Sequence, residues 1–424
     1  MLRFVLLTLL ALIVWTAVFV GGTIAGLWRQ PIAPPGDTRA FLNAAIERID
    51  HEHKGNVAFA LLERGDKVGD HFTSIGKPVD ENTRFQVASL SKWITAWGIM
   101  KLVETGKLDL DAPVSRYLTR WNLPPSKFDN QGVTVRRLLS HTAGLTDGLG
   151  YAGFEPGKPL QSLEESLTRA ADASPGASGV AQVGNEPGSA FAYSGGGYTL
   201  LQLLIEEVSG QSFNNYMKAT VFDPLGMSGS TFVLEPEAPN VAEFYDAKGA
   251  PATHYHFTAL AAASLYTTTA DLSRFLAAHV QAPHGAPAGR GVLRPDTLKH
   301  MRKPHASQFG VEIWGLGTIL YAPNNAGDFI IGHDGSNGPA INTAARVDPA
   351  TGDGIIVLES GNRLLASTIA GEWTFWHTGN VDFLTIFAEF GATLRILAAG
   401  AGAIVLAALL IAWLARRRRL RRSH

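Results

Sequence analysis

The sequence predicts an α/β fold of the α+β type, in which an antiparallel sheet is flanked by helices and carries an inserted helical subdomain. Two membrane-spanning helices are expected at its ends. Residues 4–27 and 396–415 are apolar runs without a charged side chain. Strand patterns lie near both ends of the segment between these runs, and helical patterns fill its middle. Strands from both ends of a domain can join in one sheet, and the helices between them then form the insertion.

Both apolar runs are long enough to cross a membrane, because a hydrocarbon core of about 30 Å requires roughly 20 helical residues. Six arginines follow residue 415, and Arg3 precedes the first run. Positive charge favours the cytoplasmic side. We therefore expect a transmembrane helix at 396–415, an arginine-rich tail at 416–424 and both termini in the cytoplasm. The segment between the helices is then extracytoplasmic, either periplasmic or extracellular, at the cell (inner or plasma) membrane.

The N-terminal segment, residues 1–29, has two interpretations. Its short basic start and the small residues near Ala25 are typical of a signal peptide that is cleaved. Its apolar run is, however, longer than the roughly 7 to 15 residues of a signal peptide. An uncleaved transmembrane anchor is our first expectation, and a cleaved signal peptide is the alternative.

Charge is unevenly distributed along the chain. The whole sequence has 36 basic and 37 acidic side chains and a net charge of −1. Nine of the arginines lie in residues 1–30 and 395–424, which contain no acid, so residues 31–394 keep 27 basic and 37 acidic side chains and a net charge of −10. An acidic outer domain does not favour nucleic-acid binding. Because the chain has no cysteine, disulfides, cysteine-based zinc sites and a thiolate nucleophile are excluded.

The outer domain begins with a helix and a hairpin. Asp37 or Thr38 is suited to cap the helix, because both side chains can accept a hydrogen bond from a free backbone N–H. In residues 56–76, the larger apolar side chains of Val57, Phe59 and Leu61 alternate along the chain, and a turn at Gly65 and Asp66 leads to a second short segment. This arrangement predicts two short antiparallel strands.

Helical patterns follow the hairpin, and strand patterns return near the end of the outer domain. Residues 86–105 predict one long helix, and residues 110–320 predict helices joined by loops rich in Gly, Pro and Ala. Strand patterns lie at 328–335, 340–348 and 353–360. The late strands are expected to complete the sheet that the hairpin begins.

The strongest candidate for chemistry is the pattern S-x-x-K, which occurs at Ser74 with Lys77 and at Ser89 with Lys92. The first copy precedes Pro78, which disfavours a helical turn. The second opens the long helical stretch, where residues i and i+3 share a face, so Lys92 is expected beside Ser89 and able to take its proton. A helix N-terminus favours an oxyanion at Ser89 and lowers the pKa of Lys92. A capping serine and a solvated lysine are the alternative.

Several further motifs occur in order along the chain. They are TVRRLLSHTAGL (134–145), FAYSGGGY (191–198), FDPLGMSGSTF (222–232), AAASLYTTTADLSRFL (261–276) and IGHDGSNG (331–338). Together with the second S-x-x-K, they resemble the serine β-lactamase and penicillin-binding-protein superfamily, and specifically its class C-like branch, which also holds D-alanyl-D-alanine peptidases and esterases. The resemblance covers residues 38–378 and implies a β-lactamase/transpeptidase-like serine hydrolase domain there.

The resemblance implies three catalytic residues and needs no cofactor or metal. Ser89 matches the acylated nucleophile, and Lys92 matches its partner. Tyr193 matches the tyrosine of the Y-x-N element, which acts with the lysine in moving the proton to the leaving group. The physical requirement is general, since a serine hydroxyl becomes a useful nucleophile only beside a base.

The resemblance also implies a substrate-binding strand and an oxyanion hole. His333, Asp334 and Gly335 match the K-T-G or H-x-G element on the strand that edges the cleft. The backbone N–H groups of Ser89 and Ser336 match the oxyanion hole. Two such donors stabilise a tetrahedral intermediate by several kcal/mol.

One position departs from the family pattern. Gly195 stands where Y-x-N has an asparagine whose side chain contacts the substrate. This departure makes β-lactamase activity a weaker prediction than esterase or peptidase activity. The expected function is a membrane-anchored extracytoplasmic serine acyl hydrolase that acts on an ester, an amide or a cell-wall peptide through an acyl-enzyme.

Two other functions remain open. The domain could bind or sense cell-wall peptides without turnover, which the missing asparagine favours. The terminal helices could also assemble a larger membrane complex through the small residues Ala398 and Gly402. Of the remaining histidines, His141 is expected to be a buried hydrogen-bonded support. His254 and His256 have the spacing of a metal pair but lack further ligands nearby in the sequence, so no metal site is predicted.

Overall fold

The computed structural model describes residues 2–148, 150–235, 237–338 and 340–422. Its strands are β1 (Asn56–Glu63), β2 (Asp66–Thr73), β3 (Phe85–Gln86), β4 (Tyr266–Thr267), β5 (Ala306–Gln308), β6 (Val311–Trp314), β7 (Ile319–Pro323), β8 (Phe329–Asn337), β9 (Ile341–Val347) and β10 (Gly354–Ser360). Eight of them form one antiparallel sheet in the order β2-β1-β10-β9-β8-β7-β6-β5. Two of these strands precede the helical insertion and six follow it, so the predicted sheet from both ends of the domain is confirmed.

The N-terminal hairpin forms as predicted, with a small difference at its turn. Strands β1 and β2 pair from Val57–Thr73 to Glu63–Asp66. The turn residues are Arg64 and Gly65, with φ of +52° and +84°. A two-residue turn with positive φ matches the twist of the flanking strands. The turn therefore lies one residue before the predicted position at Gly65 and Asp66.

The prediction of helices and loops for 110–320 is wrong at its C-terminal end. Strands β5, β6 and β7 form there and extend the sheet at the edge beyond β8. These strands have three to five residues, too few to show the alternation by which a strand is recognised in a sequence. They are stabilised by the sheet, in which β7 pairs with β8, β6 with β7 and β5 with β6.

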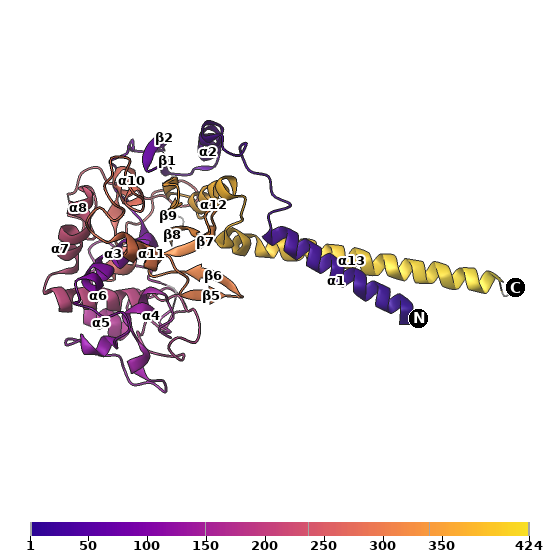
Figure 1. The fold of residues 1–424 in the computed structure, drawn as a ribbon, viewed down its shortest axis with the longest axis horizontal. Coiled ribbons are helices and arrows are strands. Elements are labelled where there is room, and N and C mark those ends of the chain that lie inside the picture. The colour runs from indigo at the N-terminus through magenta and orange to yellow at the C-terminus, as the bar shows by residue number, and fades with distance from the viewer. Residues whose placement is uncertain (1, 149, 236, 339, 423–424) are drawn as a thin grey trace.

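The helices of the domain are α2 (Thr38–Glu52), α3 (Ser91–Glu104), α4 (Val135–Leu139), α5 (Leu163–Arg169), α6 (Gly195–Ser209), α7 (Phe213–Met217), α8 (Asp223–Leu225), α9 (Leu260–Ala263), α10 (Thr269–Ala277), α11 (Pro295–Met301) and α12 (Leu365–Thr378). Helices α2 and α12 cover one face of the sheet, and the helices of the insertion cover the other (Figure 1). Strand β1 shows both layers, because Phe59 packs with α2 and α12 while Ala58 and Ala60 pack with the insertion.

The segment 86–105 is helical over a shorter range than predicted. It starts with β3 and a 3-10 turn at Ala88–Leu90, and α3 begins only at Ser91. Trp93 and Trp97 of α3 are buried against Phe275 of α10, with ring centroids 4.9 Å apart in both pairs. Helix α3 is therefore a core element, and its first turn is positioned by packing on both sides.

Two long helices, α1 (Leu2–Ile24) and α13 (Phe383–Arg422), extend side by side from the domain (Figure 1). Both are long and apolar enough to cross a membrane. Trp15 Nε1 donates a hydrogen bond to the Leu397 carbonyl at 3.0 Å, and its ring lies against Gly400. Gly402, which was expected to mark a packing face, has open space beside its Cα in this chain.

Helix α13 begins well before the predicted apolar run at residue 396, because Asp382 caps it. It also continues through the predicted cytoplasmic tail as far as Arg422. The last two residues of that tail, and the first residue of the N-terminal segment, lie outside the described part of the chain.

Candidate active site

Ser89 lies in the 3-10 turn between β3 and α3. Ala88, immediately before it, has φ of +45°, a left-handed conformation that costs a residue other than glycine about 1–3 kcal/mol. The hydroxyl of Ser91 holds this turn, since it donates to the Ala88 carbonyl at 2.6 Å and accepts from Leu265 N–H at 3.0 Å. The S-x-x-K pattern contains no signal for this strained turn, which directs the Ser89 side chain into a cleft.

Lys92 is buried beside Ser89, with only 2% of its surface exposed. Its Nζ donates to Ser89 Oγ at 3.2 Å and to the Ala262 carbonyl at 2.8 Å. Burial lowers the pKa of Lys92 to about 7, and the charge of Asp147 opposes part of that shift. The expected direction of the pKa shift is confirmed, but burial is its main cause, in place of the helix N-terminus.

Tyr193 lies near the ammonium group of Lys92, in the loop before α6. Lys92 Nζ is 5.0 Å from the centroid of its ring. Burial raises the pKa of Tyr193, and the hydroxyl of Ser89 lowers it. The structure therefore brings Ser89, Lys92 and Tyr193 together from two segments about 100 residues apart in the sequence.

His141 is buried and supports the tyrosine, in agreement with the prediction that it is a buried hydrogen-bonded support. Its ring packs on Tyr193 with centroids 4.3 Å apart, and its Nδ1 accepts a hydrogen bond from Ser194 N–H at 3.0 Å. Burial holds the pKa of His141 well below its ordinary value, and the nearby Lys92 acts in the same direction. A neutral imidazole that accepts at Nδ1 carries its proton on Nε2, so His141 orients the backbone of the Tyr193 loop.

Asp147 is a polar residue of the site that the sequence interpretation missed. Its carboxylate accepts hydrogen bonds from the hydroxyl of Ser194 and from Gly196 N–H, the latter at 2.7 Å, at the N-terminus of α6. Burial raises the pKa of Asp147, whereas these hydrogen bonds and the charge of Lys92 lower it. It lies in the loop that follows His141, and no spacing rule connects it with Lys92.

Strand β8 forms the opposite wall of the site. It pairs with β7 from Phe329 to Gly332. From His333 to Asn337 it pairs only with β9, so this part of β8 has a strand neighbour on one side only. The other side of this last part of β8 faces the turn that carries Ser89. A side chain at Gly335 would overlap the Val87 carbonyl oxygen, so glycine is required for this close approach.

The remaining predicted residues lie on the same part of β8. Gly335 and Ser336 line the cleft with Ser89. His333 is buried, and its Nδ1 hydrogen-bonds to the Asp334 carbonyl at 2.6 Å. Burial lowers the pKa of His333 to about 3, so the ring is neutral and Nε2 is an acceptor. Nε2 has no hydrogen-bond partner among the described residues.

The cleft has a volume of about 500 Å³. Its lining includes the predicted residues from the turn, the Tyr193 loop and β8, and it also includes apolar side chains from the Tyr193 loop, β6, β7 and α13. These are Phe191, Ile313, Trp314, Ile319, Phe383, Leu384 and Phe387. Apolar side chains thus surround the polar atoms near Ser89, which is typical of small-molecule sites.

The structure explains the glycine at position 195. The ring of Tyr151 occupies the space beside it, and a Cβ at Gly195 would lie 2.9 Å from that ring. The hydroxyl of Tyr151 hydrogen-bonds to Thr199 on α6 at 2.7 Å, which keeps the ring in place. An aromatic ring therefore stands where the family pattern has an amide side chain.

The other candidate residues lie elsewhere. Lys77 is 80% exposed and pairs with Glu243 at 3.6 Å, while Ser74 donates a hydrogen bond to Asn56 at 2.6 Å, so the first S-x-x-K does not form a site. His254 hydrogen-bonds to Tyr266 and stacks on an aromatic ring. Within the described ranges, no group of three or more His, Cys, Asp or Glu side chains could hold a metal ion.

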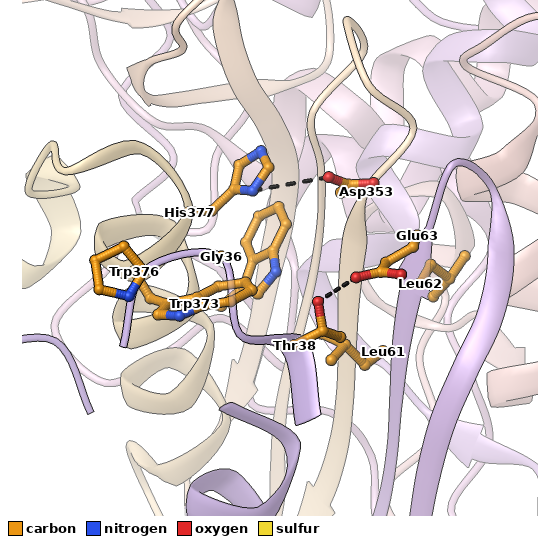
Figure 2. A pocket seen from close by; sticks show the side chains of 10 residues that line it. Gly36, Thr38, Leu61, Leu62, Glu63, Asp353, Trp373, Trp376 and His377 are labelled. Atoms are coloured by element: carbon orange, nitrogen blue, oxygen red, sulfur yellow. Dashed lines mark hydrogen bonds and ion pairs between the residues drawn. The ribbon is translucent and has the colours of Figure 1, made fainter. Parts of the chain in front are cut away.

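A second cavity, of about 300 Å³, lies between the N-terminal linker, the end of β1 and α12 (Figure 2). Thr38 and Glu63 hydrogen-bond to each other at its floor, and His377 faces Asp353 at 3.8 Å. None of the predicted site residues lines this second cavity.

Comparison with known proteins agrees with this fold. A penicillin-binding protein of Bacillus subtilis is 34% identical over 216 residues, which are 49% of this chain and 44% of the relative. Esterase EstB of Burkholderia gladioli is 32% identical over 215 residues, which are 47% of this chain and 53% of the esterase. The matched part of the chain thus spans about half the length of these curated relatives.

A solved structure and a family model extend the likeness over most of the chain. The octameric penicillin-binding protein homologue from Pyrococcus abyssi superposes with a TM-score of 0.62 at 27% identity, over 79% of this chain and 76% of that one. The model of the Beta-lactamase family matches residues 42–389. The predicted resemblance is confirmed, and the chain belongs to the Beta-lactamase family.

Proposed function

We propose that this protein is a serine acyl hydrolase, anchored in the cell membrane, with its active site outside the cytoplasm. The observation that carries this proposal is the contact of 3.2 Å between Lys92 Nζ and Ser89 Oγ in a cleft edged by the unpaired side of β8. A lysine whose pKa is lowered to about 7 is largely neutral just above neutral pH, and only its neutral form can accept a proton.

Acylation follows from this geometry. Ser89 Oγ bonds to the carbonyl carbon of the substrate while its proton passes to Lys92 Nζ. The backbone N–H groups of Ser89 and Ser336 hold the oxyanion, and each such donor lowers the barrier by about 3–4 kcal/mol. The bond to the leaving group then breaks, and Tyr193 passes the proton on to the departing alcohol or amine.

Deacylation repeats the steps with water. A water molecule loses its proton to the Tyr193 and Lys92 pair and bonds to the acyl carbon. The bond to Ser89 Oγ breaks, and the serine recovers its proton. The products are a carboxylic acid and the free enzyme, so the residues already described suffice for the cycle.

The substrate is an ester, an amide or a peptide and not preferentially a β-lactam. Support comes from Tyr151, which fills the place of the substrate-contacting asparagine at Gly195. His333 also lines the cleft with a neutral ring, whose buried Nε2 has no hydrogen-bond partner among the described atoms. The relative called esterase EstB agrees with an ester substrate.

Membrane anchoring is supported by α1 and α13. Both are apolar and mostly exposed along their length, which a soluble helix of this composition would avoid. The arginines at 416–418 favour a cytoplasmic C-terminus. The catalytic domain, which lies at the other end of α13, is then extracytoplasmic.

Labelling with a fluorophosphonate tests the nucleophile. We expect Ser89→Ala to lose the label and Ser74→Ala, in the other S-x-x-K, to keep it. Undiminished labelling of Ser89→Ala would show that another residue reacts.

A second function, binding or sensing of cell-wall peptides without turnover, is favoured by one observation. A buried ion pair joins Arg346 of β9 to Asp382, the cap of α13, and Arg346 also contacts Asp334 of β8. A ligand in the cleft could act on the membrane helix through this pair. Repeated turnover of a chromogenic ester by the full-length protein, lost in Ser89→Ala, would exclude a purely sensing role.

A further inference from the structure

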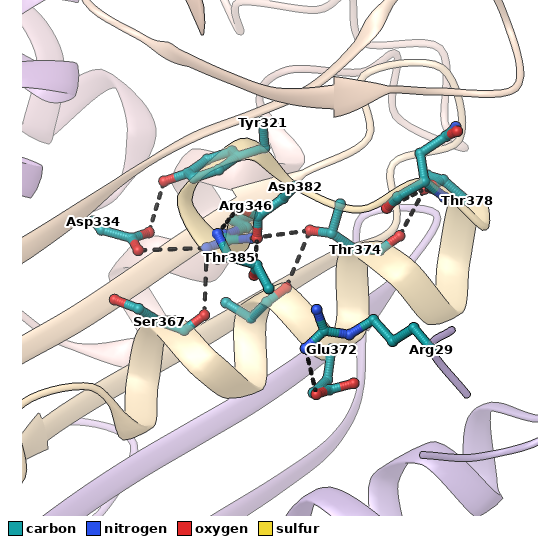
Figure 3. Close-up of polar contacts among 12 residues, drawn as sticks. Arg29, Tyr321, Asp334, Arg346, Ser367, Glu372, Thr374, Thr378, Asp382 and Thr385 are labelled. Carbon is teal, nitrogen blue, oxygen red and sulfur yellow. Dashed lines mark hydrogen bonds and ion pairs between the residues drawn. The ribbon is translucent and has the colours of Figure 1, made fainter. Parts of the chain in front are cut away.

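Helix α13 is fixed to the catalytic sheet by buried charges (Figure 3). Arg346, which is fully buried, donates to Asp382 at 2.5 Å and to Thr374 at 3.1 Å. Asp382 in turn accepts from Thr385 N–H at 2.9 Å and so caps α13. Removing one partner of a buried pair of this kind is strongly destabilising, because it leaves an uncompensated buried charge. The first turn of α13 therefore has a defined position relative to β8 and β9.

The end of helix α1 is held against the first turns of α13 by ion pairs. Arg29, which follows α1, pairs with Glu389 of α13 at 2.9 Å and with Glu372 of α12 at 3.3 Å. The two long helices thus leave the domain together (Figure 1). The orientation of the cleft relative to both helices is set by these contacts.

The first turns of α13 form part of the cleft. Phe383, Leu384 and Phe387 line it together with Ser89. The rings of Phe383 and Phe387 are 6.1 Å apart, and Phe387 lies 6.2 Å from Phe309, which is outside the cleft. Apolar side chains therefore lead from the cleft to the outer surface.

That surface carries a patch that we call the aromatic rim, made of Phe309, Val311, Phe387 and Phe390. Their exposed fractions are 84%, 51%, 44% and 60%. Phe309 is at the tip of the β5–β6 hairpin with φ of +52°, a strained conformation that keeps the ring outward. The hairpin lies on the side of the domain from which α13 leaves (Figure 1). Exposed apolar patches of this kind mark sites of interaction.

The rim lies beside the membrane surface. Counted along α13, Phe390 precedes the uncharged run that starts at Ile396 by six residues, or about 9 Å of helix. Because the headgroup layer on each side of the hydrocarbon core is roughly 5–8 Å thick, this places Phe390 at the outer edge of that layer. The uncharged run of α1 ends at Leu27, and Trp28 and Arg29 follow at the level of Glu389. Aromatic side chains are favoured at this interface.

We propose that the cleft takes its substrate from the membrane surface, and that this substrate is an amphiphilic ester or amide with a long apolar chain. The reacting carbonyl enters toward Ser89, and the chain lies along Phe387 and Phe309 and into the outer leaflet. This inference rests on the proposed acyl-hydrolase function, and it names the substrate class of that same site.

Depth measurement tests the position of the rim without any activity. The chain has no cysteine, so Phe309→Cys gives a unique site for a nitroxide label. In the full-length protein reconstituted in phosphatidylcholine vesicles, we expect this label to be reached by oxygen and protected from a water-soluble nickel complex. Val233→Cys, which replaces an equally apolar side chain that is 48% exposed beyond α8, is the control and should be open to nickel. Equal access of nickel to both labels would overturn the proposal.

Chain-length preference tests the substrate class. We expect the full-length protein in vesicles to cleave a membrane-embedded p-nitrophenyl palmitate with at least tenfold higher kcat/KM than p-nitrophenyl acetate. Phe309→Ser should reduce that ratio at least fivefold, whereas Val233→Ser should leave it within twofold of the wild-type ratio. An unchanged ratio in Phe309→Ser would contradict the role of the rim.

The outcomes separate the two proposals. Cleavage of the acetate ester without a preference for the palmitate ester would overturn the amphiphilic substrate and leave the hydrolase function standing. Failure to cleave either ester, together with an unlabelled Ser89, would overturn the hydrolase function and the substrate inference with it.

Discussion

The chain contains the same S-x-x-K pattern twice, in two different environments. At Ser74 the lysine is exposed, pairs with a surface carboxylate and lies away from its serine. At Ser89 the lysine is buried, contacts its serine and meets a tyrosine from a distant segment. Burial lowers the pKa of Lys92 to about 7. The comparison teaches that the pattern sets only the spacing of the two groups, while burial sets their chemistry.

Replacing the lysine of each S-x-x-K by alanine should give the largest difference in activity. Lys92→Ala removes the proton acceptor beside Ser89, and we expect kcat/KM for a short ester to fall by about 10²–10⁴. Lys77→Ala breaks only a surface ion pair, and both activity and stability should stay within experimental error. Steady-state kinetics of the purified protein checks both. An equal loss of activity in the two variants would contradict the different roles of the two lysines.

The glycines of the two regions give the next effect. Gly335→Ala places a methyl group on the Val87 carbonyl next to the nucleophile, and we expect a destabilisation of about 1–3 kcal/mol and at least a tenfold loss of activity. Gly76→Ala meets no backbone atom, only the ends of the Tyr245 and Glu243 side chains. It should therefore lower the free energy of unfolding by less than Gly335→Ala does. Thermal and urea unfolding compare the two, and equal costs would contradict the close approach of β8.

The pH dependence of activity sharpens the comparison further. Because neutral Lys92 accepts the proton and its pKa is about 7, kcat/KM should rise with pH through about 7. The charge of Asp147 raises the pKa of Lys92, so Asp147→Asn should move this rise to lower pH. Folding of the variant can be checked by circular dichroism. A rise that stays in place in Asp147→Asn would show that Lys92 is not the titrating group.

Local patterns were sufficient for several elements of the fold. The β1–β2 hairpin follows from alternation around a turn, and α2 begins directly after its cap, Asp37, whose side chain accepts a hydrogen bond from Ala40 N–H. Both long apolar helices follow from composition alone. Strands β5 to β7 were missed, because three to five residues carry too little periodicity and are stabilised by neighbours from elsewhere in the chain.

The sequence by itself determined which groups could react. Helical spacing brings Ser89 and Lys92 to one face, and the ordered motifs pointed to Tyr193, His333, Gly335 and Ser336. It also determined that apolar segments flank an acidic domain. These properties are local, because they depend on residues close together in the chain or on composition.

Only the tertiary structure decided how these groups meet. The burial of Lys92, the carboxylate of Asp147, the ring of Tyr151 over Gly195 and the wall that α13 adds to the cleft all depend on contacts between distant segments. No local pattern encodes such contacts, since they arise when the sheet and the helical insertion pack together. The same packing places the opening of the cleft beside the first turns of α13.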